Sequence, residues 1–259
     1  MICHYQELRH QEQTEITLYL RNVFLAWLCM KTTKTNPDIP IIFEDNHLLV
    51  IDKPAGVLSQ EDHTGDPDVL NLCKAYIKKE YNKPGNVYMG LVHRLDRPVS
   101  GVMVLAKTSK AASRLSYQIR KRTMKKTYWA LVHGMSPVYG EHVHFLDKDN
   151  RTNIVKAYKS PKGNAKESRL NFITIKQSKK FSVVEVDLIT GRPHQIRVQF
   201  AKEGNPLWGD HKYGNPDKNF GKDIALRAVK LELEHPTKKE LMTFKAPKPT
   251  GQPWNVFEY

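Results

Sequence analysis

The run from His93 to Gly101 carries the side chains in this sequence that are most able to do chemistry. It reads His-Arg-Leu-Asp-Arg-Pro-Val-Ser-Gly, so Asp96 stands beside Arg94 and Arg97. An opposite charge close by favours the ionised form of a carboxyl group. An ionised aspartate can act as a nucleophile or as a base, and two arginines favour a negatively charged substrate. The alternative is a surface salt-bridge cluster, which contributes little to stability.

A second polar run, Thr-Gly-Arg-Pro-His-Gln-Ile-Arg, ends at Arg197. Pro193 suits the first turn of a helix, and the free N–H groups of a helix start suit a phosphate. On that helix His194 and Arg197 share one side, three residues apart. We expect Arg197 to lie half-buried beside the core and to need an anionic partner, for which Asp96 is the candidate. The alternative is an arginine on an exposed helix face.

The chain as a whole is strongly basic. Its 259 residues carry a net charge of +14, from 41 Lys and Arg against 27 Asp and Glu. Such an excess favours a polyanionic partner, with nucleic acid ahead of an anionic membrane. No segment of the sequence approaches the run of about 18 or more uncharged apolar residues that a membrane-spanning helix needs.

The three cysteines, Cys3, Cys29 and Cys73, form no Cys-x-x-Cys pair. This spacing predicts neither a disulfide framework nor a zinc knuckle, and a reducing cytoplasm is the expected location. Residues 1–40 read as an N-terminal extension and residues 41–259 as one domain. Residues 1–29 lack the pattern of a secretory signal, and one hypothesis places the native start at Met30.

Hydrophobic patterning predicts more strands than helices. One helix is expected to begin with Asp66 as its N-cap, and a second with Ser109. The second has a basic outer side, which indicates either a solvated surface or a contact with RNA. Strands are expected at residues 41–43, 48–51, 126–134, 170–175, 181–188 and 229–234, and a basic loop at residues 156–166. We therefore predict an α+β domain with a mixed, largely antiparallel sheet flanked by helices and loops.

Six segments resemble the RluA-type RNA pseudouridine synthases, and the run around Asp96 is similar to the catalytic loop of that family. In chain order the segments are residues 49–56, 93–101, 126–134, 190–197, 209–214 and 226–228. One such segment is a weak signal, but six in the right order are specific. The chain departs from the family pattern at Val99 and Gln199, where no chemical role is expected. Lys53 and Tyr213 match family segments and are expected to serve packing or phosphate contact.

The resemblance implies that a uridine in RNA is detached from its ribose at N1 and rejoined at C5, without a cofactor or a metal. Asp96 matches the catalytic aspartate, and whether it attacks the sugar C1′, attacks uracil C6 or takes a ribose proton stays open. Tyr128 is expected to stack on the uracil, and Arg197 to orient Asp96. Arg94 is expected to fill the gap that the flipped base leaves. The expected RNA contacts are His93, Arg94, Arg97, Arg192 and His194.

The resemblance includes no N-terminal RNA-binding module, so the expected substrate is a compact rRNA or tRNA stem-loop. We expect a monomer that acts away from membranes. Two other functions compete with this hypothesis. An RNA-binding protein without activity predicts that Asp96 is dispensable. A metal-dependent nuclease that uses His93, Asp96, His194 and Asp210 predicts loss of activity with a chelator.

Overall fold

The computed structural model of the protein describes residues 39–214 and 223–257, which belong to the compact unit Asp38–Tyr259. The predicted extension over residues 1–40, and with it the hypothesis about Met30, lies almost wholly outside the described residues. The elements are β1 (Ile41–Glu44), β2 (Leu48–Lys53), α2 (Val69–Glu80), β3 (Gly90–Leu91), β4 (Ser100–Ala106), α3 (Ser109–Lys121), β5 (Lys125–His133), β6 (Tyr139–Asp149), β7 (Ile154–Tyr158), β8 (Lys166–Gln177), β9 (Phe181–Leu188), α4 (Gln195–Lys202), β10 (Leu226–Glu234), β11 (Leu241–Lys245) and the short 3-10 helix η1 (Trp254–Phe257).

Eleven strands form one sheet in the order β1-β2-β4-β10-β5-β9-β8-β6-β7, with β11 paired to β10 and β3 paired to β4. The pairing of β4 with β10 is parallel, and the other pairings are antiparallel. The predicted α+β class with a largely antiparallel sheet is confirmed. Because β10 lies between β4 and β5, a strand from late in the sequence joins the two parts of the sheet.

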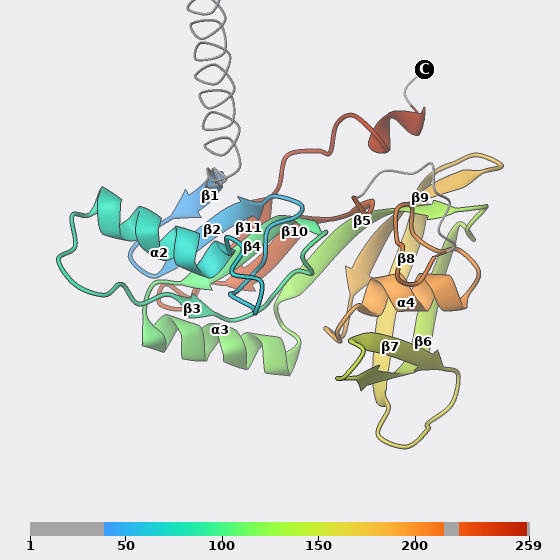
Figure 1. Ribbon diagram of the computed structural model, residues 1–259, viewed down its shortest axis with the longest axis horizontal. Helices are drawn as coiled ribbons and strands as arrows, with labels where there is room; N and C mark the ends of the chain where they lie inside the picture. The colour runs from blue at the N-terminus through green and yellow to red at the C-terminus, as the bar shows by residue number, and fades with distance from the viewer. Residues whose placement is uncertain (1–38, 215–222, 258–259) are drawn as a thin grey trace, which may run out of the picture. The chain divides into compact units, whose positions relative to one another are not determined.

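The helices cover different parts of the sheet (Figure 1). Helix α3 packs against β4 and β10, and its buried residues include Leu115. Helix α4 packs against β6 and β7, and its Phe200 meets Phe172 of β8 with ring centroids 5.2 Å apart. Strand β4 is almost wholly buried from Val102 to Ala106, as its continuous apolar run requires of a central strand. No helix in the described residues is long and apolar enough to cross a membrane.

The helix starts differ from the prediction by one or two residues. The N-cap of α2 is Asp68, whose side chain accepts the N–H of Asn71, while the carboxylate of Asp66 binds Arg97 instead. The N-cap of α3 is Thr108 and not Ser109. In both cases two residues of types that favour the N-cap position lie one or two positions apart in the sequence. Contacts made in the folded protein then decide which of them caps the helix.

Two further boundaries also differ. Helix α4 begins at Gln195, after His194 in a left-handed conformation, so Pro193 precedes the helix rather than opening it. The predicted basic loop at residues 156–166 begins inside β7. Its polar residues face solvent on an edge strand, which hides the strand from a hydrophobic pattern.

Gly101, at the start of β4, allows the parallel contact with β10. Its φ is +120°, and a Cβ placed there would collide with the backbone of Ala228. Backbone atoms cannot move aside as the tip of a flexible side chain can, so this close approach needs glycine. The approach fixes where the loop before β4, which carries Asp96, leaves the sheet.

We predict that Gly101→Ala lowers the free energy of unfolding by about 2–5 kcal/mol, because it adds both a strained φ and a backbone clash. Urea denaturation followed by circular dichroism measures the change. Gly85→Ala is the control, since a Cβ at Gly85 meets no atom within 4 Å. We expect it to stay within about 0.5 kcal/mol of the wild type. Equal effects of the two substitutions would contradict the close-contact explanation.

Candidate active site

One cavity of about 1200 Å³ is lined by every residue that the sequence analysis predicted for the site. Four come from the loop between β3 and β4, one from β5, two from the segment before α4, and one from α4 itself. In chain order they are His93, Arg94, Asp96, Arg97, Tyr128, Arg192, His194 and Arg197. The fold therefore brings together the segments that lie about one hundred residues apart in the chain.

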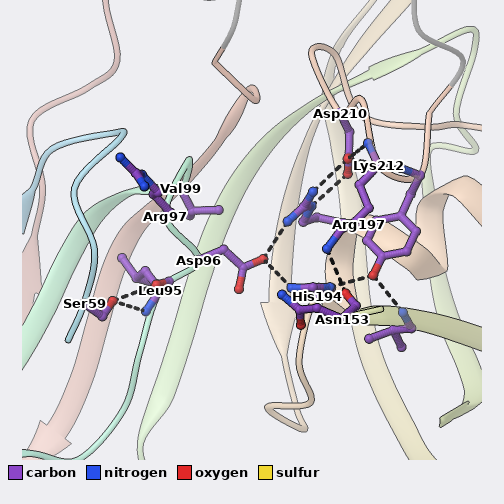
Figure 2. Close-up of polar contacts among 12 residues, drawn as sticks. Ser59, Leu95, Asp96, Arg97, Val99, Asn153, His194, Arg197, Asp210 and Lys212 are labelled. Carbon is purple, nitrogen blue, oxygen red and sulfur yellow. Dashed lines mark hydrogen bonds and ion pairs between the residues drawn. The ribbon is translucent and has the colours of Figure 1, made fainter. Parts of the chain in front are cut away.

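Arg197 links two carboxylates across this cavity (Figure 2). Its Nη1 lies 2.9 Å from Oδ2 of Asp96, while its Nε and Nη2 each lie 2.8 Å from an oxygen of Asp210. Burial disfavours the charged guanidinium, but the bonds to Asp210 and then to Asp96 outweigh it and raise the pKa of Arg197. Arg197 is therefore a fixed cation, as its predicted pairing with Asp96 requires.

The two carboxylates have different environments. The side chain of Asp210 is fully buried, and its Oδ1 also accepts the backbone N–H groups of Lys212 and Tyr213. The side chain of Asp96 is 28% exposed, and its Oδ2 is the oxygen that faces both Arg197 and His194. Asp210 thus anchors the arginine, and Asp96 keeps Oδ1 available to the cavity. The sequence analysis missed this anchoring role because nothing in the spacing of Asp210 relates it to Arg197.

His194 completes the surroundings of Asp96 (Figure 2). Its Nε2 lies 3.9 Å from Oδ2 of Asp96, and its Nδ1 lies 2.5 Å from the hydroxyl of Tyr213. That hydroxyl also accepts the N–H of Val155, and the Tyr213 ring lies 5.3 Å from the guanidinium carbon of Arg197. Burial lowers the pKa of His194. Tyr213 therefore holds two of the groups that face Asp96, which is a packing role.

The two arginines beside Asp96 in the sequence do not bind it. Arg97 forms an ion pair with Asp66 at 2.8 Å, and Arg94 lies 3.4 Å from the side-chain oxygen of Gln60. The interpretation that these sequence neighbours are the ion-pair partners of Asp96 is therefore wrong, and the cation that pairs with it comes from α4. Side chains of successive loop residues point in different directions, so closeness in sequence does not predict contact.

Lys53, the last residue of β2, fixes the loop that carries Asp96. The lysine is fully buried, and its Nζ donates to the carbonyl oxygens of Pro54, Arg97 and Val99 at 2.8–3.1 Å. Burial lowers the pKa of Lys53 to about 7, against the opposing effect of the Asp96 carboxylate. Because Arg97 and Val99 follow Asp96 directly, the lysine holds the backbone on that side of the aspartate.

Tyr128 faces the cavity from β5 and is 6% exposed. Burial, together with the charge of Asp96, raises the pKa of its phenol. The ring therefore stays protonated and uncharged at neutral pH. An uncharged aromatic ring beside a carboxylate can stack on a base, and its O–H can donate a proton or a hydrogen bond.

His93 lies on the loop before Asp96, where its ring is held by β4. Its Nε2 accepts the backbone N–H of Val104 at 3.0 Å. A backbone amide can only donate, so Nε2 carries no proton and the neutral ring carries its proton on Nδ1. Burial, with the nearby charge of Lys126, lowers the pKa of His93 to about 3. His93 is therefore a neutral donor through Nδ1 over the physiological range.

Two of the four residues that the nuclease alternative would use already bind other groups of the protein. Both oxygens of Asp210 bind Arg197, and Nε2 of His93 binds Val104. Among residues 39–214 and 223–257, no group of three or more His, Cys, Asp or Glu side chains is placed to hold a metal ion.

We predict that Asp210→Asn lowers the free energy of unfolding by about 3–5 kcal/mol, because it leaves a buried arginine with half of its charge compensation. Asp66→Asn removes the partner of an exposed arginine and is the control, with an expected loss below about 1 kcal/mol. Urea denaturation of both variants at pH 7 measures the difference. If Asp210→Asn cost no more than Asp66→Asn, Asp210 would not be the anchor.

We predict that His93 does not titrate between pH 8 and pH 4. Its folded-state pKa lies below the ordinary value of 6.5, so the unfolded chain takes up the proton first as the pH falls. The stability that His93 contributes is therefore complete above pH 6.5 and is lost as the pH falls towards 3. Histidine ¹⁵N spectra recorded across this range should show one unprotonated Nε2 throughout. A ring signal that moves with a midpoint near pH 6.5 would contradict the assignment.

Comparisons with known proteins all point to one family. Residues 47–202 match the family described as RNA pseudouridylate synthase. The chain is 35% identical over 213 residues to the uncharacterized RNA pseudouridine synthase YhcT of Bacillus subtilis, over 82% of this chain and 69% of that protein. It is 33% identical over 225 residues to the ribosomal large subunit pseudouridine synthase D of Neisseria meningitidis, over 82% of this chain but 58% of that protein. The chain thus spans less than two thirds of some relatives that it matches.

Solved structures share the fold. The human RNA pseudouridylate synthase domain containing 1 superposes with a TM-score of 0.66 at 23% identity, over 82% of this chain and 84% of that one. The human RNA pseudouridylate synthase domain containing 4 superposes with a TM-score of 0.66 at 22% identity, over 89% of this chain and 94% of that one. The family match and the sequence relatives show that this chain belongs to the RNA pseudouridine synthase family, as the resemblance to its RluA-type members predicted.

Proposed function

We propose that this protein converts a uridine in a structured RNA to pseudouridine, with Asp96 as the catalytic residue. The observation that carries the proposal is the placement of Asp96 between a fixed cation, Arg197, and an uncharged aromatic ring, Tyr128, in one cavity. A carboxylate held by one oxygen can react through the other. This combination suits attack on a neutral nucleoside better than it suits RNA binding alone.

The proposed reaction needs no redox partner and no second substrate. The bond between N1 and C1′ breaks, the base turns, and a bond between C5 and C1′ forms. The proton lost from C5 is balanced by the proton gained at N1. Oδ1 of Asp96 is the group that starts this sequence, by attack on C1′, by attack on C6 or by removal of a ribose proton.

Tyr128 offsets the cost of exposing the base. A uridine within a stem must turn out of its helix, which costs a few kcal/mol. Stacking on an aromatic side chain returns about 1–3 kcal/mol. Arg94 is an exposed residue that lines the cavity, and we propose that it occupies the position that the base leaves. Arg97, Arg192 and His194 add basic or polar groups for RNA contacts around the cavity.

The substrate that we propose is a stem-loop of ribosomal or transfer RNA. The relative from Neisseria meningitidis is named for the large ribosomal subunit, so ribosomal RNA is the first substrate to test. The net charge of +14 supports binding to phosphates without sequence preference, and the shape of the loop then selects the site. We further propose that the protein acts as a monomer in the cytoplasm, without a cofactor.

We predict that Asp96→Asn abolishes pseudouridine formation, with a rate at least about 1000-fold lower, because the amide cannot serve as nucleophile or base. The measurement is pseudouridine mapping of total RNA by carbodiimide labelling and reverse transcription. It compares cells with the wild type, with no protein and with Asp96→Asn. Asp147→Asn is the control, because Asp147 is exposed on β6 and lies outside the cavity.

Each outcome of the mapping has a distinct meaning. A site lost without the protein and with Asp96→Asn, but kept with Asp147→Asn, identifies the reaction, the aspartate and the substrate together. A site that survives Asp96→Asn contradicts the catalytic assignment. No change at any site contradicts the proposed function once a second enzyme with the same target has been excluded, and the binding-protein function is then favoured.

A further inference from the structure

Two hydrogen-bond donors in the cavity have no acceptor within residues 39–214 and 223–257. One is the Nδ1–H of His93, whose tautomer is fixed by Val104. Among the described residues nothing accepts from it, and the atom is buried. The other is the ammonium group of Lys126, for which the described residues provide neither an ion pair nor a hydrogen bond. Both side chains line the cavity that holds Asp96.

Lys126 is close to the reacting centre. It lies two residues before Tyr128 on β5, so the two side chains share one face of the strand about 7 Å apart. Thr127, between them, points to the other face and bonds to Asp187 of β9. Across the cavity Lys126 meets Gly191, where an added Cβ would lie 4.0 Å from its Nζ. The lysine therefore sits between the uracil-stacking ring and the segment before α4.

The two donors line one cavity and influence each other electrostatically. The charge of Lys126 is one of the two causes that lower the pKa of His93, and burial lowers the pKa of Lys126 itself. His93 cannot accept a proton from the lysine, because its Nδ1 already carries one and its Nε2 is occupied. A half-buried cation and a buried neutral donor that line the same cavity can both be satisfied by one negatively charged group.

We propose that Lys126 and His93 form a binding subsite for the backbone phosphodiester next to the target uridine. This proposal rests on the proposed function, because that function makes RNA the ligand. It adds a site that positions the RNA backbone to the site that holds the base. A phosphodiester is the anionic group that a nucleotide stacked on Tyr128 brings with it. Among the described residues no carboxylate pairs with Lys126, and the Asp96 carboxylate pairs with Arg197 instead.

The test uses the whole chain with Asp96→Asn, titrated with the dinucleotide UpU and with the same dinucleotide carrying a neutral methylphosphonate linkage. Histidine ¹⁵N and ¹H spectra follow the Nδ1–H of His93. We expect UpU to shift this signal and the neutral analogue to leave it unchanged. We expect Lys126→Met to weaken UpU binding about tenfold, the usual effect of losing one charge-assisted hydrogen bond. Lys126→Arg should retain part of the affinity.

Lys125→Met is the matched control, because Lys125 is an exposed neighbour on the same strand and its loss changes the net charge equally. We expect it to change the affinity less than about twofold, as an exposed charge does. Thermal unfolding supplies a second readout. Lys126→Met removes a half-buried charge without a partner, so it should not lower the melting temperature.

Two results would overturn the subsite. Equal shifts with UpU and with the neutral analogue would assign the donors to a uracil carbonyl group. A lower melting temperature for Lys126→Met with unchanged UpU binding would make the lysine structural. The proposed function fails separately: if the wild type forms no pseudouridine but UpU binding still depends on Lys126, the subsite stands and the isomerisation does not.

Discussion

The structure of the site depends on one buried guanidinium shared by two carboxylates. Arg197 is held by two bonds from Asp210, which is itself fixed by backbone N–H groups, and offers its remaining edge to Asp96. A buried cation needs opposite charge around it, so neither carboxylate can be lost without consequence. The same ion pair that satisfies the arginine also orients Asp96, the proposed catalytic residue. Of the two aspartates that bind this arginine, Asp210 anchors it, and Asp96 is the one to which we assign the chemistry.

The loop that carries Asp96 is held in place by residues that have no part in the proposed reaction. Lys53 binds the backbone after the aspartate, and Ser59 exchanges two hydrogen bonds with Leu95 immediately before it. Gly101 then lets the chain pass close to β10. Rigid support on both sides is what a catalytic group needs, because small displacements of a reactive atom slow a reaction strongly. The site is thus built by backbone contacts as much as by side chains.

Much of the fold and the site could be predicted from the sequence. The sheet class followed from alternating and continuous apolar runs, and the pairing of Arg197 with Asp96 followed from a helix face that needed an anion. The role of Asp210 could not be predicted, since no local pattern links it to Arg197. The additional expectation that Arg94 and Arg97 also pair with Asp96 was wrong, because spacing says nothing about where loop side chains point.

The position of β10 has a consequence for how the protein is made. Asp96 belongs to the part of the sheet that ends at β4, and Arg197 to the part that begins at β5 and β9. Strand β10 is what joins β4 to β5, and it is synthesised after all three. During translation, elements near the N-terminus fold first, whereas contacts between distant segments form late. The two parts of the sheet that carry Asp96 and Arg197 are therefore joined only after β10 has been made, so we expect the carboxylate and its arginine to meet late in the synthesis of the chain.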